Sequence, residues 1–137
     1  MWASWLSDST LPALEQTAAF SQRRHMLLAG NIANMDVPGY QTRDLSVDDF
    51  QSALRDAVRA ADQPDSSSDV GSSSKLAAID KVRDVSKQIL YHDGSDVSLE
   101  EQVTQISKNQ VMHDMAIALM RSQFQTMQVA IRESVAV

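Results

Sequence analysis

The last third of the sequence predicts one very long helix, and no other feature limits the possible fold as strongly. Ser98-Leu99-Glu100-Glu101 matches a capping box, in which Ser98 caps the helix and Glu101 reaches back to it. A helix of about 36 residues starting at Leu99 would measure roughly 54 Å. A compact globule of this chain length is only about 40 Å across. The sequence therefore predicts an elongated molecule, or a helix that packs against other chains.

The predicted helix carries an unbroken heptad seam, because mostly apolar residues recur at alternating steps of four and three. The seam positions are Leu99, Val103, Ile106, Gln110, His113, Ile117, Met120, Phe124, Met127 and Ile131. A second seam of the same spacing follows a capping residue, Ser9 or Thr10, and a proline that suits a first helical turn, Pro12. Its positions are Leu11, Leu14, Ala18, Ser21, His25, Leu28 and Ile32.

The two seams predict a mainly α, elongated fold in which the N- and C-terminal helices pack against each other as a coiled coil. The apolar seam residues are the expected coiled-coil and assembly interface. The seam histidines, His25 and His113, are expected to form a polar layer that fixes the register between the two helices.

The N-terminal helix is expected to end near Asn34. Asparagine tolerates the left-handed conformation that closes many helices, so Asn31 or Asn34 is the expected terminator. Pro38-Gly39 fits the central positions of a type II turn, where glycine supplies the positive φ. The chain is therefore expected to bend sharply at Tyr40.

The middle of the chain is expected to be flexible and partly irregular. Residues 47–61 predict a short helix with Phe50, Leu54 and Val58 on one face. The serine- and aspartate-rich stretch 62–74 has almost nothing to bury and predicts a flexible loop. Residues 75–92 fit either a helix or, in their second half, a strand. We therefore expect an N-terminal segment and helix over 1–36, the irregular middle over 37–97, and the C-terminal helix over 98–137.

The final helix is nearly uncharged, whereas the middle of the chain is acidic. Residues 62–101 carry nine acidic and four basic side chains, but residues 102–137 carry only two acidic and three basic ones. A two-stranded coiled coil in water usually has charged residues beside its seam. This helix instead has apolar residues away from its seam, at Val111, Met112, Met115, Leu119 and Val129. Several of its faces are therefore expected to be buried, which indicates self-assembly or packing inside a larger complex.

Composition argues against several functional classes. The net charge is −6, which disfavours nucleic acid as a partner. The chain has no cysteine, which excludes disulfides and thiolate metal sites, and no apolar run long enough to span a bilayer. The N-terminal segment lacks the features of a Sec signal, so export would need another route; its Trp2, Trp5 and Leu6 favour docking onto protein over a membrane. We expect neither a metal nor a cofactor.

Each end of the chain also carries a more specific motif. The first motif combines Arg24 and Leu28-Ala29 with Asn31, Ile32, Ala33 and Asn34, followed by Pro38, Gly39 and Tyr40. The last helix adds Asn109-Gln110, Phe124 and Ala130-Ile131-Arg132. Together these segments resemble the flagellar rod and hook proteins, which typically have Asn-Ile-Ala-Asn followed by Thr-Pro-Gly-Tyr. Val37 replaces the usual threonine, and Arg43-Asp44-Leu45 is similar to a proximal-rod member of the family.

The resemblance implies a structural subunit of the proximal rod in the bacterial flagellar basal body, next to the export gate. It also implies that the N- and C-terminal helices form an antiparallel coiled coil. It implies export by the flagellar type III apparatus and a place in the periplasmic rod. The implied partners are further copies of the chain, rod proteins of the FlgC, FliE and FlgF types, and export-gate proteins. It implies neither nucleic acid binding nor an integral membrane protein.

Two other functions compete with this interpretation. The first is a non-flagellar helical adaptor that binds one partner through the same helical hairpin. The second is an enzyme that uses His113, which we disfavour because no set of nucleophile, base and orienting group is visible. His113 and Asp114 are neighbours on a helix and are expected to point apart.

Overall fold

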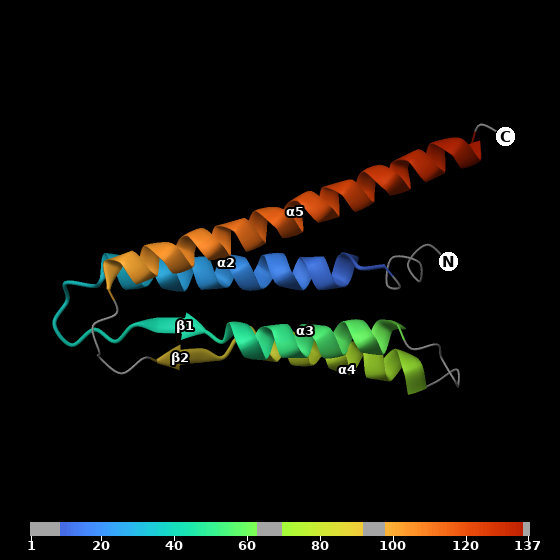
Figure 1. Cartoon of the computed structure of the whole chain (residues 1–137). Coiled ribbons are helices and arrows are strands. Elements are labelled where there is room, and N and C mark those ends of the chain that lie inside the picture. Colours follow the sequence, from blue (N-terminus) through green and yellow to red (C-terminus); the bar gives the residue numbers. More distant parts are fainter. Residues whose placement is uncertain (1–8, 63–69, 92–97, 136–137) are drawn as a thin grey trace.

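The computed structural model describes residues 9–62, 70–91 and 98–135 (Figure 1). Its elements are, in chain order, α2 (Leu11–Ala33), β1 (Arg43–Leu45), α3 (Val47–Asp62), α4 (Val70–Val85), β2 (Ile89–Tyr91) and α5 (Leu99–Val135). Figure 1 shows α2 and α5 on one side, with the two-stranded ribbon and the pair α3 and α4 alongside α2. All the helices run roughly lengthwise, so the molecule is elongated.

The terminal helices pack against each other in opposite directions, which confirms the predicted helical hairpin. At the start of α5 the Ser98 Oγ accepts a hydrogen bond from the Glu101 N–H at 3.2 Å, the capping contact expected from the sequence. At the start of α2 the N-cap residue is Thr10, which makes no side-chain capping bond, and the preceding Ser9 accepts through its Oγ from the Leu11 N–H at 3.3 Å. Pro12 lies in the first turn of α2, where a missing N–H has no cost.

The end of α2 differs in mechanism from the prediction. Asn34 follows the last helical residue as expected, but its φ is −113°, and no described residue other than glycine has a positive φ. The prediction of a left-handed asparagine is therefore wrong. Asn34 instead uses its side chain, whose Nδ2 donates to the Gly30 carbonyl at 2.7 Å. Asn31 lies inside the helix and is buried.

The turn after α2 follows the prediction. The Tyr40 N–H donates to the Val37 carbonyl at 3.1 Å, and Gly39 has a φ of +78°. These two features define a type II turn across Pro38 and Gly39. The turn sends the chain back along α2 and into β1.

We predict opposite effects of alanine at two glycines near this turn. A Cβ at either Gly30 or Gly39 would meet no atom within 4 Å, so backbone conformation alone decides the outcome. Gly39→Ala forces an alanine into a positive φ and should destabilise the fold by about 1 kcal/mol. Gly30→Ala lies within a helix and should stabilise it by up to about 1 kcal/mol. Urea unfolding followed by circular dichroism checks both; two shifts of the same sign would contradict the assignment.

Only part of the predicted α5 seam is buried in the single chain: Ile106, Ile117, Met120 and Met127 are partly buried. Four seam residues of α5 are about half exposed or more: Leu99 (51%), Val103 (49%), Phe124 (51%) and Ile131 (61%). The buried positions are instead Gln102, Asn109 and Ala116, at heptad spacing. On α2, Ser21 and Leu28 are buried as predicted, but His25 is exposed. The most deeply buried positions of α5 are offset from the predicted seam because the residues that pack on α2 include the amides Gln102 and Asn109.

The middle of the chain is more regular than predicted. Residues 70–74, expected in a loop, belong to α4, and residues 63–69 of the same expected loop lie outside the described residues. Residues 75–91 combine both predicted alternatives, because α4 ends at Val85 and β2 follows. The antiparallel pairing of β1 with β2, Arg43 opposite Tyr91 and Leu45 opposite Ile89, was not predicted.

The hydrophobic core lies where the middle segment packs against α2. Phe20 of α2 stacks on Phe50 of α3, with ring centroids 3.9 Å apart and an angle of 12° between the planes. Leu45, Ala53 and Val82 complete the buried cluster. This core holds β1, α3 and α4 against α2. The direction of β1 relative to α2 is set by the turn that follows α2.

Candidate functional site

Polar side chains cross from α2 to both β1 and α5, and we refer to the group Arg24, Asn31, Tyr40, Asp44, Gln102 and Gln105 as the polar junction. Arg24 forms a paired contact with Asp44 of β1, through Nε to Oδ1 at 2.8 Å and Nη2 to Oδ2 at 2.7 Å. The Arg24 Nη2 also donates to the Gln105 Oε1 of α5 at 3.0 Å. The side chains of Arg24 and Asp44 are only 7% and 18% exposed. A two-point contact of this kind fixes orientation as well as distance.

Asn31 makes the largest number of contacts in the polar junction. Its Nδ2 donates to the Arg43 carbonyl at 2.7 Å and to the Gln102 Oε1 at 3.2 Å. Its Oδ1 accepts from the Arg43 N–H at 3.0 Å and from the Tyr40 hydroxyl at 3.2 Å. One side chain therefore pairs with both main-chain groups of Arg43, as a neighbouring strand would, and joins α2 to β1, the turn and α5.

A further contact joins the two long helices nearer their middle. Asn109 of α5 is buried, and its Nδ2 donates to the Ser21 carbonyl of α2 at 2.7 Å. Asn109 Oδ1 has no hydrogen-bond partner among the described residues, which is a cost of burying this amide. The Ser21 hydroxyl donates to the Thr17 carbonyl within α2. The predicted polar layer between the helices therefore exists, but amides form it in place of the two histidines.

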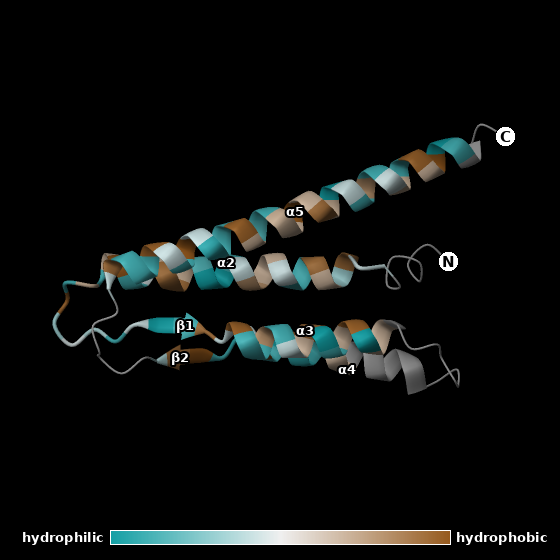
Figure 2. Ribbon diagram, in the orientation of Figure 1, coloured by the Kyte–Doolittle hydropathy of each residue, from teal (hydrophilic) through white to brown (hydrophobic). Residues whose placement is uncertain are grey.

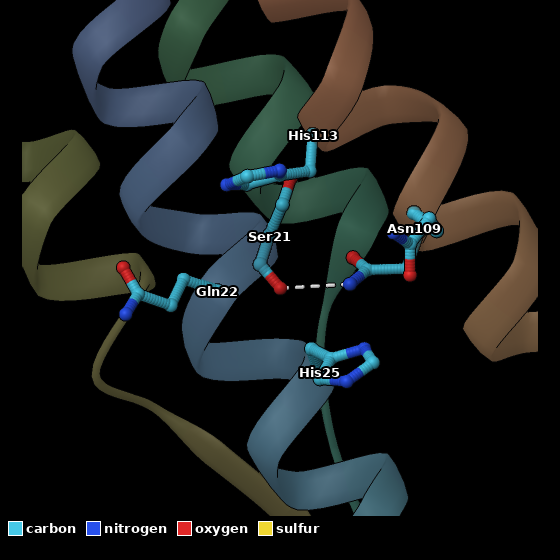
Figure 3. Close-up of a pocket in the computed structure, with 6 residues that line it drawn as sticks. Ser21, Gln22, His25, Asn109 and His113 are labelled. Atoms are coloured by element: carbon cyan, nitrogen blue, oxygen red, sulfur yellow. Dashed lines mark hydrogen bonds between the residues drawn. The ribbon is translucent and has the colours of Figure 1, made fainter. Parts of the chain in front are cut away.

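The two predicted histidines lie at the edge of this layer. His25 and His113 line a groove of about 330 Å³ between α2 and α5, and Figure 3 shows them on either side of the Ser21–Asn109 bond. The His113 Nδ1 lies 3.4 Å from the Asp114 Oδ1, so the expectation that these neighbours point apart is wrong. Within the described ranges no three His, Asp or Glu side chains gather as metal ligands would.

Tyr40 links the polar junction to the surface through Arg43. The Arg43 guanidinium carbon lies 5.8 Å from the centre of the Tyr40 ring, within the range of a cation–π contact. Side-chain hydrogen bonding with Tyr40, and then electrostatic attraction to it, raises the pKa of Arg43.

The predicted site residues lie in two places: the family-motif residues at the end of α2, and the interface residues along α2 and α5. Asn31, Asn34, Gly39 and Tyr40 of the family motif come together around the end of α2, with Ile32 partly buried and Ala33 and Pro38 exposed. The α2 residues Leu11, Leu14 and Ala18 are partly buried, as are Ile106, Ile117, Met120 and Met127 of α5.

Sequence reasoning missed the amides of α5 and the pairing of Arg24 with Asp44. One signal was present in the printed sequence: Gln102, Asn109, Ala116 and Gln123 follow one another at intervals of seven. Amide and small residues repeated every seven positions on an otherwise apolar helix indicate a face that packs against a neighbouring helix through hydrogen bonds.

The polar junction has the chemistry of a structural device. Its groups satisfy one another, and it holds no arrangement of nucleophile and base among the residues described. What it does is fix the angle at which the chain leaves the long helical hairpin. The fold and this site define an elongated helical structural protein, consistent with the resemblance to flagellar axial proteins.

Comparison with known proteins gives a more specific result. The chain is 29% identical to the flagellar basal body rod protein FlgB of Salmonella typhimurium strain LT2, over 88% of this chain and 91% of that protein. It is 26% identical to the FlgB proteins of Escherichia coli strain K12 and Shigella flexneri, over the same shares of both chains. No protein-family model matches the chain. The similarity covers most of both chains and supports a FlgB-like flagellar rod protein.

Proposed function

We propose that the chain is a structural subunit of the proximal rod, assembling through its terminal helices into the axial drive-shaft next to the export gate. The supporting observation is the exposed apolar surface of α5. Side chains on it are 47% to 68% exposed in the single chain: Val103, Val111, Met115, Leu119, Phe124, Val129 and Ile131. Figure 2 shows hydrophobic residues along the whole of α5. A surface of this kind marks a site of protein–protein contact.

The predicted seam residues Leu99, Val103, Phe124 and Ile131 fit this proposal better than they fit a seam within one chain. Leu99 and Val103 are about half exposed although α2 lies alongside this part of α5, whereas Phe124 and Ile131 lie beyond the start of α2, which therefore cannot cover them. In the assembled rod Leu99, Val103 and Ile131 would pack against neighbouring copies or against rod proteins of the FlgC, FliE and FlgF types. The polar junction would give every copy the same shape, which regular packing requires.

The proposal includes export by the flagellar type III apparatus to the periplasmic rod. Among the described helices, none has the length and apolar character needed to cross a bilayer. The FlgB proteins to which the chain is similar carry the name of basal body rod proteins. In the rod, the chain would also contact export-gate proteins.

A single charge on α5 should abolish assembly without unfolding the chain. Val111 is 68% exposed, so Val111→Asp should leave the thermal melt nearly unchanged. A carboxylate buried in a helix-packed interface costs far more, and we expect loss of motility and of rods in a bacterium that depends on this chain. Swimming assays and electron microscopy of basal bodies measure the effect.

The control is Val58→Asp, since Val58 is 38% exposed and belongs to α3, which is neither of the two terminal helices. It should leave motility in place. Normal rods with Val111→Asp would refute assembly through α5. Small defined complexes in place of axial assemblies would instead favour the adaptor function.

A further inference from the structure

The C-terminal part of α5 extends beyond the start of α2. The Gln123 Nε2 donates to the Thr10 Oγ1 at 2.9 Å, directly before α2 begins. From Phe124 to the end of α5 about a dozen residues remain, or roughly 18 Å of helix. Figure 1 shows this part running past α2 and diverging from it. We refer to residues 124–135 as the overhang.

The overhang is apolar along one side. Phe124 and Ile131 are 51% and 61% exposed, and Met127 between them is partly buried. These three residues are three and four positions apart, so they lie on one face of the helix. Within the overhang only Arg132 and Glu133 are charged. An apolar face of this kind in water favours being covered.

Residues 1–8 lie outside the described residues, but the structure fixes where they attach. They join the chain at Ser9, next to Thr10 and therefore at the base of the overhang. Their sequence, MWASWLSD, holds both tryptophans of the chain and a leucine, with Asp8 as the one charged side chain. Eight residues reach at most about 26 Å, which exceeds the length of the overhang.

We propose that Trp2, Trp5 and Leu6 pack onto the overhang of the same chain, over Phe124 and Met127. The covalent attachment beside Gln123 gives this segment a high effective concentration at the overhang that no separate partner matches. The packing continues the α2–α5 contact past the point where α2 begins. A membrane surface fits the segment less well, because it has no basic side chain to bind anionic lipid. This inference does not depend on the proposed role in the rod.

Tryptophan fluorescence tests the inference directly, because both tryptophans belong to the proposed segment. In the full chain at low concentration we expect emission at shorter wavelength than tryptophan in water, and weak quenching by acrylamide. Phe124→Asp and Met127→Asp should each shift the emission to longer wavelength and increase the quenching. Met115→Asp changes the same residue type on the same helix, at a position that is 59% exposed, and should do neither.

A cross-link gives a second measurement if a variant unfolds. The chain has no cysteine, so Leu6→Cys combined with Met127→Cys introduces one pair, which should oxidise rapidly within the monomer. Leu6→Cys with Met115→Cys should not.

Three results would overturn the inference. The first is water-like emission from the unmodified chain together with no cross-link. The second is a short-wavelength emission that disappears on dilution, which would assign the contact to a second copy. The third is a shift seen only with phosphatidylglycerol vesicles, which would assign it to lipid.

Discussion

Asn31→Ala is expected to lower the free energy of unfolding by about 2–4 kcal/mol, which is a large part of the stability of a small domain. The substitution removes four hydrogen bonds at once, to the Arg43 main chain, Tyr40 and Gln102. Gln102 is 6% exposed, so its side-chain oxygen would lose a partner that water cannot easily replace. Urea unfolding followed by circular dichroism measures the loss.

The matched control for Asn31 is Asn34→Ala, three residues further along the same motif. The Asn34 side chain makes one hydrogen bond, to the Gly30 carbonyl at its own helix end. Its loss should cost about 0.5–1 kcal/mol. Equal effects of the two substitutions would mean that the contacts across to β1 and α5 add nothing. Hydrogen exchange at the Arg43 amide offers an independent check, since Asn31→Ala should speed it and Asn34→Ala should not.

The long helices were predictable because they depend on local signals. Ser98 caps α5, and neither Pro nor Gly interrupts residues 99–135. The Pro38-Gly39 turn was predictable for the same reason, since its geometry depends on two neighbouring residues. These features need no knowledge of what lies across the molecule.

The contacts between elements were not predictable in the same way. Asparagine is a residue type that often ends helices, so the sequence suggested that role for Asn31. Its actual role, binding the main chain of Arg43, depends on β1 returning alongside α2. The face of α5 that packs on α2 is set by Asn109 and Gln102, whose partners are distant in sequence. Residues 70–74 of α4 have a loop composition, so tertiary contacts later in α4 must outweigh local preference there.

Arg24→Met should be the second most damaging change, costing about 2–3 kcal/mol, because it leaves the Asp44 carboxylate without its partner. Asp44 is 18% exposed and also accepts from the Leu45 N–H, so the cost should fall below that of a completely buried pair.

Arg23→Met is the matched control for Arg24, since Arg23 is the adjacent, exposed arginine; it should change stability by less than about 0.5 kcal/mol. Adding Asp44→Asn to Arg24→Met should recover part of the loss, because removing both charges avoids an unpaired one. The difference between the two arginines should also persist in high salt, which screens exposed pairs far more than buried ones. If salt removes it, or if Asp44→Asn makes the Arg24→Met chain still less stable, then Arg24 contributes through packing and not through the ion pair that holds β1 against α2.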